Sequence, residues 1–397
     1  MTAITERTVV GVVGAGAMGA GIAQVAAQRG HAVVLADAFP AALARAREGH
    51  AKAMAREVEK GRLARDAADA VLARITYVEG VTPAALRAFE PCGVVIEAIV
   101  EDLAVKRALF RDLETEVAKD AILATNTSSL SIAAIAGACA HAERVVGLHF
   151  FNPAPVMPLV EVIPAITTAP AVTDAAKALA ERWLKVVVVA ADTPGFIVNR
   201  VARPFYGEAL RIAEERIADP ATIDWAMKEH GKFKMGPFEL MDFIGNDVNY
   251  AVTCSVYEGM FQDPRYRPSL IQRRLVEAGL LGRKTGRGHY DYRADAVLPE
   301  PSRHQATGRQ IVERILAMLV NEAVEAVRLG IASPHDIELA MLRGVNYPKG
   351  LLAWGDEIGP RHVLETLESL QAEYVEDRYR PSPLLRRIVR DGGRLLP

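Results

Sequence analysis

The chain has 397 residues, of which 50% are hydrophobic and 24% charged, and its 47 basic side chains nearly balance 49 acidic ones. This length provides for two or three domains, each able to bury its own core. The charge balance argues against a general nucleic-acid binder, whose basic surface would release counterions on binding. Three widely spaced cysteines, Cys92, Cys139 and Cys254, exclude a disulfide scaffold and a paired-cysteine metal site, and they suit a reducing compartment.

The hydropathy pattern gives no sign of a membrane protein. No apolar run reaches the roughly 18 residues that a transmembrane helix needs. The first eight residues do not resemble a signal peptide. We therefore expect a soluble cytoplasmic protein without a membrane partner, most simply an enzyme.

The first half of the chain alternates short apolar runs with helical patterns. Helices are predicted from a Gly-rich turn to Arg29, twice within 40–74, near 103–118 and over 173–184. The apolar runs predict strands at Val9–Val13, Ala32–Ala36, Val94–Ile96, Ile122–Ala124, Val145–Phe150 and Val186–Ala190. Short apolar strands between helices predict a parallel sheet covered on both faces, which is an α/β domain.

After Thr193-Pro194-Gly195 the strand patterns stop and amphipathic helical patterns continue to the end of the chain. We place the first domain at 1–190. The stretch from Tyr292 to Thr307 carries two prolines among small and polar residues and is predicted to be a linker.

The helical part contains an internal repeat. Glu208-Ala209 recurs as Glu322-Ala323, and further identities share this offset of 114 residues, such as Pro220 with Pro334 and Gly236 with Gly350. After a one-residue gap, the pentapeptide Arg265–Ser269 recurs as Arg378–Ser382. Two copies are too few for a solenoid. We predict two copies of one all-α domain, at 191–293 and 304–397.

A dinucleotide-binding pattern begins the chain. Gly14-Ala15-Gly16-Ala17-Met18-Gly19 follows the first predicted strand and opens a helix, and Asp37 ends the next strand 23 residues after Gly14. Gly14 permits the tight turn, Gly16 lets the backbone approach a pyrophosphate, and Gly19 lets helix and strand pack closely. The helix N-terminus attracts phosphates. We predict a Rossmann-like site.

The same residues indicate which cofactor is bound. The Asp37 carboxylate can accept hydrogen bonds from both ribose hydroxyls and would repel a 2′-phosphate. No arginine follows at 38 or 39 to receive such a phosphate, so NAD is favoured over NADP. The alternatives are FAD and a Gly-rich turn without a ligand.

Two polar segments follow predicted strands, at the usual ligand crevice of such a sheet. They are Asn126-Thr127-Ser128-Ser129 and His149-Phe150-Phe151-Asn152-Pro153, and Glu161 follows shortly after. An enzyme that oxidises an alcohol needs a base that titrates near neutral pH, and histidine is suited to this task. A carboxylate would orient the ring, and a hydroxyl or amide would hold the substrate oxygen.

These segments resemble the L-3-hydroxyacyl-CoA dehydrogenases in order and spacing through about residue 293. The second helical copy resembles the duplicated C-terminal domain of longer bacterial members, including 3-hydroxybutyryl-CoA and 3-hydroxyadipyl-CoA dehydrogenases. The matching motifs are Gly14–Gly19, Glu97–Glu101, Asn126–Ser129, His149–Pro153, Asp192–Arg200 and Met235–Leu240. The resemblance implies reversible oxidation of an (S)-3-hydroxyacyl-CoA to the 3-oxoacyl-CoA with NAD, in fatty-acid or phenylacetate-type degradation.

The resemblance also implies roles for individual residues. His149 is the base and Glu161 its partner, Ser128 binds the substrate 3-oxygen, Asn199 holds the substrate, and Asn152 supports this network. The residues that match NAD contacts are Asp37, Glu101, Lys106 and Asn126. Lys60 matches a CoA contact. Two positions depart from the family pattern: Ala53 stands where a serine touches CoA, and His289 stands where an aromatic residue packs.

Other interpretations exist for several of these residues. Ser128 could be a helix N-cap, Glu161 a surface carboxylate, and Lys60 a solvated lysine. The remaining histidines have no partners at ligand spacing, so we expect no metal site. Two rival functions are a non-catalytic relative and another NAD enzyme, such as a β-hydroxyacid or sugar-acid dehydrogenase.

The second helical copy lacks the Gly-Phe-Ile-Val-Asn-Arg motif of residues 195–200, so we expect no active site there. Members of the family with one helical domain dimerise through it. We expect either a homodimer or a second copy that packs on the first and imitates that dimer contact within one chain.

Overall fold

The computed structural model describes residues 4–396. The chain forms two compact units, Met1–Thr193 and Pro194–Pro397. Both expected helical copies, 191–293 and 304–397, fall within the second unit, and their bounds as separate domains stay a prediction.

The first unit is built on an eight-stranded sheet with the order β3-β2-β1-β4-β5-β6-β7-β8. All neighbouring strands run parallel except β6 and β7, which are antiparallel. The strands are β1 Val9–Val13, β2 Val33–Asp37, β3 Ile75–Glu79, β4 Cys92–Glu97, β5 Ile122–Thr125, β6 Val145–Phe150, β7 Leu159–Pro164 and β8 Val186–Val189. The predicted α/β fold is confirmed.

Two strands were not predicted, and one of them changes the topology. β3 lies at the sheet edge, and its Thr76 and Glu79 are exposed, so it lacks the continuous apolar run of a buried strand. β7 follows β6 after only residues 151–158. A parallel crossover needs roughly a dozen residues or more, so this short connection makes β6 and β7 antiparallel.

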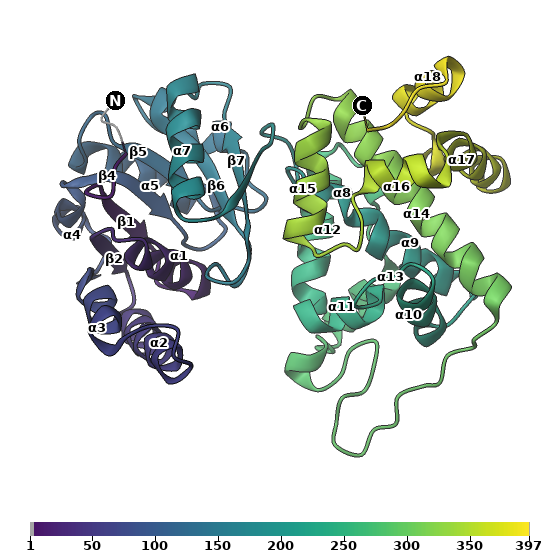
Figure 1. Cartoon of the computed structure of the whole chain (residues 1–397), viewed down its shortest axis with the longest axis horizontal. Helices are drawn as coiled ribbons and strands as arrows, with labels where there is room; N and C mark the ends of the chain where they lie inside the picture. Colours follow the sequence, from purple (N-terminus) through teal and green to yellow (C-terminus); the bar gives the residue numbers. More distant parts are fainter. Residues whose placement is uncertain (1–3, 397) are drawn as a thin grey trace. The chain divides into compact units, whose positions relative to one another are not determined.

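Helices cover both faces of the sheet (Figure 1). They are α1 Ala17–Gln28, α2 Pro40–Glu59, α3 Arg65–Ala73, α4 Pro83–Leu86, α5 Leu103–Glu116, α6 Ile132–Ala136 and α7 Pro170–Arg182, with short 3₁₀ turns at η1 Arg87–Phe89 and η2 Ala142–Arg144. The pattern from the Gly-rich turn to Arg29 is α1, and that over 173–184 is α7.

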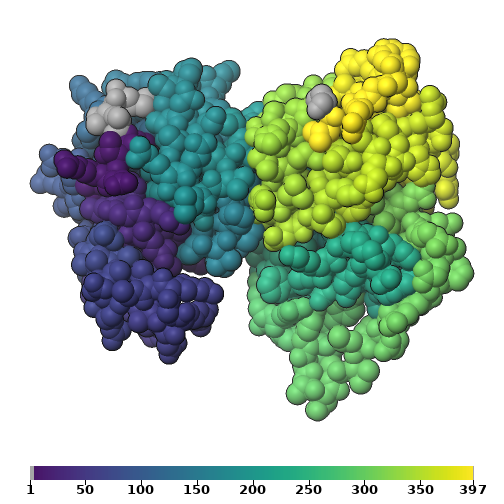
Figure 2. Space-filling view, viewed as in Figure 1, coloured from purple at the N-terminus to yellow at the C-terminus, as the bar shows by residue number. Residues whose placement is uncertain are grey.

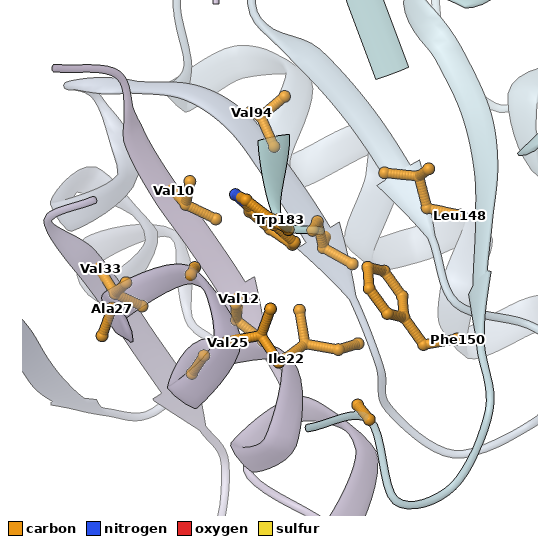
Figure 3. Close-up of a cluster of buried hydrophobic side chains, with 14 of the residues drawn as sticks. Val10, Val12, Ile22, Val25, Ala27, Val33, Val94, Leu148, Phe150 and Trp183 are labelled. Atoms are coloured by element: carbon orange, nitrogen blue, oxygen red, sulfur yellow. The ribbon is translucent and has the colours of Figure 1, made fainter. Parts of the chain in front are cut away.

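A core of buried aliphatic side chains lies between the sheet and helices α1 and α7. Alternate residues of each strand enter it, such as Val10 and Val12 of β1 and Leu148 and Phe150 of β6. Figure 3 shows these side chains meeting Ile22 of α1, together with Trp183 at the end of α7. The residues in between, including His149, therefore point to the opposite face of the sheet.

The second unit is all-α, as predicted. Its elements are α8 Val198–Val201, α9 Arg203–Glu214, α10 Pro220–Glu229, α11 Pro237–Ile244, α12 Asn246–Gly259, η3 Pro264–Tyr266, α13 Leu270–Glu277, η4 Arg283–Thr285, α14 Gln305–Arg328, α15 Pro334–Gly344, α16 Leu351–Ile358, α17 Pro360–Tyr374, η5 Asp377–Tyr379 and α18 Pro383–Asp391. The segment predicted as a linker forms an extended loop that ends where α14 begins (Figure 1).

The sequence repeat corresponds to a structural repeat. α11 and α16 have equivalent bounds at the offset of 114, and η3 and η5 have equivalent bounds at 113. α14 packs on α9 and α10 of the first copy, and Figure 2 shows the light green and yellow second copy lying directly over the teal helices.

One difference between the two copies lies at their first helix. The first copy has a break between α8 and α9, whereas α14 is continuous. Pro204, directly after the break, has no backbone N–H to donate to the preceding turn. The equivalent residue in α14 is Met318, which leaves that helix intact.

The copies contact each other through two reciprocal ion-pair clusters. Glu208 of the first copy accepts from Arg314 Nε at 2.6 Å and from the Tyr379 hydroxyl at 2.8 Å, both in the second copy. Glu322 of the second copy accepts from Arg200 Nε at 2.7 Å and from the Tyr266 hydroxyl at 2.5 Å, both in the first. The equivalent pairs lie at offsets of 114 and 113, so the contact between the copies is reciprocal: each copy offers the other the same groups.

Among the described residues, no helix is long and apolar enough to cross a membrane. The three cysteines are free thiols.

Candidate active site

Four polar side chains occupy one face of the sheet, near the carboxyl ends of β4, β5 and β6 and on the facing part of the antiparallel β7. Val94, Ile96 and their counterparts on β5, β6 and β7 enter the core beneath α1 and α7. Strand periodicity therefore sends the alternating residues to the other face. They are Glu97 on β4, Thr125 on β5, His149 on β6 and Glu161 on β7.

The Gly-rich turn between β1 and α1 has the geometry that the sequence predicted. Gly14 has a φ of 103°, and a Cβ there would lie 2.4 Å from the Ala98 carbonyl oxygen. A Cβ on Gly19 would lie 1.8 Å from the Gly14 carbonyl oxygen, so only glycine lets α1 approach the turn. A Cβ on Gly16 would meet no atom within 4 Å. This open side lines a cavity of about 420 Å³, together with Ala17.

Asp37 at the end of β2 is connected to this turn. Its Oδ2 accepts from the Ala15 backbone N–H at 2.6 Å, and its Oδ1 accepts from the Phe39 N–H at 2.8 Å. Each carboxylate oxygen keeps a further lone pair. The side chain is half-buried and fixed by these bonds.

Lys106 of α5 is buried between two carboxylates. Its Nζ lies 2.5 Å from Glu97 Oε1 and 3.2 Å from Glu101 Oε2. Glu97 is fully buried and also accepts from the Thr125 hydroxyl at 2.6 Å and from the Ile99 N–H at 2.7 Å. The three charged groups therefore tie the ends of β4 and β5 to α5.

Glu101 organises the loop that follows β5. Its Oε1 accepts from the Thr127 hydroxyl at 2.6 Å, the Ser128 N–H at 3.0 Å and the Ser129 hydroxyl at 2.9 Å. Burial alone would raise the pKa of Glu101, but Lys106 and these hydrogen bonds outweigh it and lower the pKa. The charged form of Glu101 thus holds Ser128 in place.

The neighbouring residues of this loop have distinct roles. Asn126 Oδ1 accepts from the Phe150 N–H at 2.8 Å, which joins β5 to the end of β6. Ser131 caps α6, its side chain accepting from the Ala134 N–H. The interpretation of Ser128 as the helix N-cap is therefore wrong, because α6 begins three residues later than that interpretation needs.

His149 and Glu161 form a buried pair. They lie directly opposite each other in the antiparallel β6–β7 pairing, and His149 Nδ1 is 2.6 Å from Glu161 Oε2. The Glu161 side chain is 0% exposed and the His149 side chain 7%. The interpretation of Glu161 as a surface carboxylate is wrong, because β7 buries it against the histidine.

The other candidate residues are distributed over loops and helices. Asn152 is exposed in the loop after β6, and Lys60 is exposed at the end of α2. Ala53 packs in part against the core. Asn199 is half-buried on α8 in the second unit.

His289 is half-buried, and its ring packs edge-on against Phe238, with centroids 4.8 Å apart. Its N–H donates to Asp242 Oδ1 at 2.9 Å. Burial lowers the pKa of His289 to about 4, so the ring is a neutral packing group. This agrees with its expected role.

Glu97 is a site residue to which the sequence analysis gave no role of its own. A carboxylate at the end of a buried apolar strand is costly unless it is paired. That pattern was visible in the sequence and could have pointed to Lys106 as its partner.

Comparisons with known proteins decide the family. The family model described as "3-hydroxyacyl-CoA dehydrogenase, NAD binding domain" matches residues 9–193. The one described as "3-hydroxyacyl-CoA dehydrogenase, C-terminal domain" matches residues 195–292 and 311–394. The chain belongs to the 3-hydroxyacyl-CoA dehydrogenase family.

Relatives from bacteria and mammals agree with this assignment. The chain is 40% identical to the 3-hydroxyadipyl-CoA dehydrogenase of Escherichia coli K12, over 95% of this chain and 96% of that protein. It is 41% identical to the human mitochondrial hydroxyacyl-coenzyme A dehydrogenase, over 71% of this chain and 90% of that one.

Solved structures give the same result. A crystal structure of a 3-hydroxybutyryl-CoA dehydrogenase from E. coli K12 matches with a TM-score of 0.91 and 37% identity, over 97% of this chain and 99% of that one. A (S)-3-hydroxybutyryl-CoA dehydrogenase from Ralstonia eutropha matches with a TM-score of 0.69 and 38% identity, over 72% of this chain and 99% of that one. This dehydrogenase uses NAD to oxidise a 3-hydroxyacyl-CoA to the 3-oxoacyl-CoA, and the non-catalytic alternative is set aside.

Proposed function

We propose that His149 is the general base of this dehydrogenase and that Glu161 orients it. The observation that carries the proposal is the 2.6 Å contact between His149 Nδ1 and Glu161 Oε2. A carboxylate at this distance accepts a hydrogen bond from the Nδ1–H of the neutral ring. The lone pair of Nε2 is then available to take the 3-hydroxyl proton. The buried carboxylate also stabilises the imidazolium that forms.

The Gly-rich turn fits the cofactor. The open side of Gly16 admits a pyrophosphate, and the first turn of α1 supplies N–H donors to it. Asp37 accepts from the ribose hydroxyls. When bound, NAD accepts the hydride from C3 of the substrate. Glu101 and Asn126 contribute contacts to the cofactor directly, and Lys106 acts by holding Glu97 and Glu101 in position.

The substrate oxygen is held by hydrogen-bond donors. Ser128, fixed through its N–H to Glu101, donates its hydroxyl to the 3-oxygen. Asn199 holds the thioester substrate, and Asn152 supports the same network from the loop after β6. Lys60 contacts the CoA phosphates. The exposed position of Lys60 suits a contact with a polyanion and equally a solvated lysine.

The setting of the reaction follows from the resemblance. We place the enzyme in the cytoplasm, in a degradation pathway of fatty-acid or phenylacetate type. Relatives are named for 3-hydroxybutyryl-CoA and for 3-hydroxyadipyl-CoA, so their names do not decide between acyl chains.

Replacing His149 tests the proposal. His149→Ala should lower kcat by roughly 10²- to 10⁴-fold, the usual contribution of a general base, with little change in the KM for NAD. His141→Ala is the matched control, because His141 belongs to the same unit and is half-exposed beside Glu143. An unchanged kcat in His149→Ala would overturn the assignment.

A further inference from the structure

One buried arginine of the helical unit has no carboxylate partner. Six arginines among residues 4–396 are more than nine-tenths buried, and five of them lie within 4 Å of an Asp or Glu oxygen. The sixth is Arg203, which is 6% exposed and has no acidic side chain within that distance in the described part of the chain. The paired arginines are Arg144, Arg200, Arg265, Arg314 and Arg378.

The groups around Arg203 are all neutral. Its Nε donates to the Asn199 carbonyl at 2.7 Å, and its Nη1 lies 3.1 Å from the Thr253 hydroxyl and 3.5 Å from the Asn249 carbonyl oxygen. The guanidinium also lies 4.9 Å from the centre of the Tyr206 ring. Burial lowers the pKa of Arg203. A buried cation without a counter-charge is costly, and the structure retains this one.

A second polar group near Arg203 is also unsatisfied. The Tyr347 side chain is 5% exposed, and its hydroxyl has no hydrogen-bond partner in the described structure. Burial raises the pKa of Tyr347, and the nearby charge of Arg203 acts against that shift. Tyr347 belongs to the second helical copy, so that copy brings an unused donor towards the guanidinium.

The polar character extends along α12. Asn249 Oδ1 accepts from Gln272 Nε2 at 3.1 Å, and Asn246 is joined to Asp242 at 2.7 Å. All of these side chains are buried. A pocket for an unsubstituted alkyl chain is expected to be apolar, whereas the groups in contact with the Arg203 guanidinium are two backbone carbonyls, a hydroxyl and the Tyr206 ring.

Arg203 lies one helical turn from the residue that holds the substrate. It follows Asn199 by four positions and bonds to the Asn199 carbonyl. One turn advances about 5.4 Å along the helix axis. That span is comparable to the three carbon–carbon bonds between C3 and the terminal carboxylate of a six-carbon dicarboxylyl chain.

We propose that Arg203 binds a carboxylate at the far end of the acyl chain and so selects 3-hydroxydicarboxylyl-CoA substrates. The inference rests on the proposed role of Asn199 in substrate binding. The carboxylate supplies the counter-charge that the five other buried arginines find within the protein, and the Tyr347 hydroxyl is a further donor to it. Such charge-assisted hydrogen bonds are the strong ones.

The alternative is that Arg203 only stabilises the helix break before Pro204 by satisfying the Asn199 carbonyl. The two roles differ in what they do to substrates of equal length. A structural arginine affects all substrates alike, whereas a carboxylate-binding one affects only those with the second carboxylate.

The test compares (S)-3-hydroxyadipyl-CoA with (S)-3-hydroxyhexanoyl-CoA, which differ only in the terminal carboxylate. The unmodified enzyme should prefer the adipyl substrate in kcat/KM. Arg203→Met should lower kcat/KM for the adipyl substrate by about 10- to 100-fold more than kcat/KM for the hexanoyl substrate. Arg203→Lys keeps the charge and should retain part of the preference.

Two more variants complete the design. Tyr347→Phe should lower the adipyl value several-fold without changing the hexanoyl value. Arg273→Met is the control, because Arg273 is an exposed arginine of the same unit that pairs with Glu277. If Arg203→Met does not fold, Arg203→Lys and Tyr347→Phe test the inference through the ratio of kcat/KM for the adipyl and hexanoyl substrates.

Three outcomes would overturn the inference: no adipyl preference in the unmodified enzyme, an unchanged ratio in Arg203→Met, or equal losses on both substrates. In each of these outcomes the activity of the unmodified enzyme on (S)-3-hydroxyhexanoyl-CoA is still measured, so the proposed function is tested separately. Activity on neither substrate would contradict the proposed function itself.

Discussion

Asp37 combines two tasks in one carboxylate. It fixes the Gly-rich turn through the Ala15 N–H and, in our proposal, accepts from the cofactor ribose. Its negative charge would repel the 2′-phosphate of NADP. We therefore expect Asp37→Ala to raise the KM for NAD and to relax the rejection of NADP, measured as the ratio of kcat/KM for the two cofactors.

The control for this prediction is Asp112→Ala, since Asp112 is an exposed acid on α5 of the same unit. It should leave the ratio unchanged. If Asp37→Ala keeps the cofactor preference of the unmodified enzyme, Asp37 does not recognise the ribose hydroxyls.

His289 makes stability depend on pH. Burial lowers its pKa to about 4 in the folded protein, whereas the unfolded value is about 6.5. Between these values the unfolded chain binds the proton and the folded one does not, so stability rises with pH through this window and is full above about 6.5. The loss at pH 5 amounts to about 2 kcal/mol.

Replacing the ring isolates this contribution. His289→Phe keeps the packing on Phe238 and should be more stable, relative to the unmodified protein, at pH 5 than at pH 7.5 in urea titrations. His335→Phe, at an exposed position on α15, should show no such change with pH. Parallel stability curves for His289→Phe and the unmodified protein would contradict the pKa shift as the cause.

At the scale of elements, the sequence predicts those parts of the fold that local patterns specify. The buried strands are continuous apolar runs, and β1 and β6 have the predicted bounds. β3 was missed because an edge strand alternates polar and apolar residues. The direction of β7 depends on the length of a loop and on pairing with β6, which no pattern within 159–164 encodes.

The candidate site, too, was predicted where local patterns specify it and missed where tertiary packing does. Asn126, Ser128 and His149 were proposed from motif and position, because side chains near the carboxyl ends of neighbouring parallel strands converge, and Glu161 was proposed as the partner of His149 from the resemblance. The partners of Glu97, Glu101 and Lys106 were not predicted. The bond from Ser128 to Glu101 joins residues 27 positions apart, and that from Lys106 to Glu97 joins α5 to β4. Which surface of α5 meets which strand is set by packing.

At the scale of the molecule, the second helical copy completes the first. Arg200 and Glu208 of the first copy are buried against Glu322 and Arg314 of the second. Removing one partner of a buried ion pair leaves an uncompensated charge, which costs about 3–5 kcal/mol. The first copy alone would therefore carry buried charges and an uncovered apolar face.

Deletion of residues 304–397 tests this dependence. In the whole chain, α14 covers α9 and α10 with a largely buried helix. Because the ion-pair clusters are reciprocal, a second truncated chain can offer its own Arg200 and Tyr266 to Glu208. We expect the truncated protein to self-associate or aggregate, as seen by light scattering, and Glu208→Ala in the truncated chain to weaken any dimer. A truncated protein that stays monomeric and fully active would show that the second copy is dispensable, because its charged and apolar contacts would then have no structural consequence.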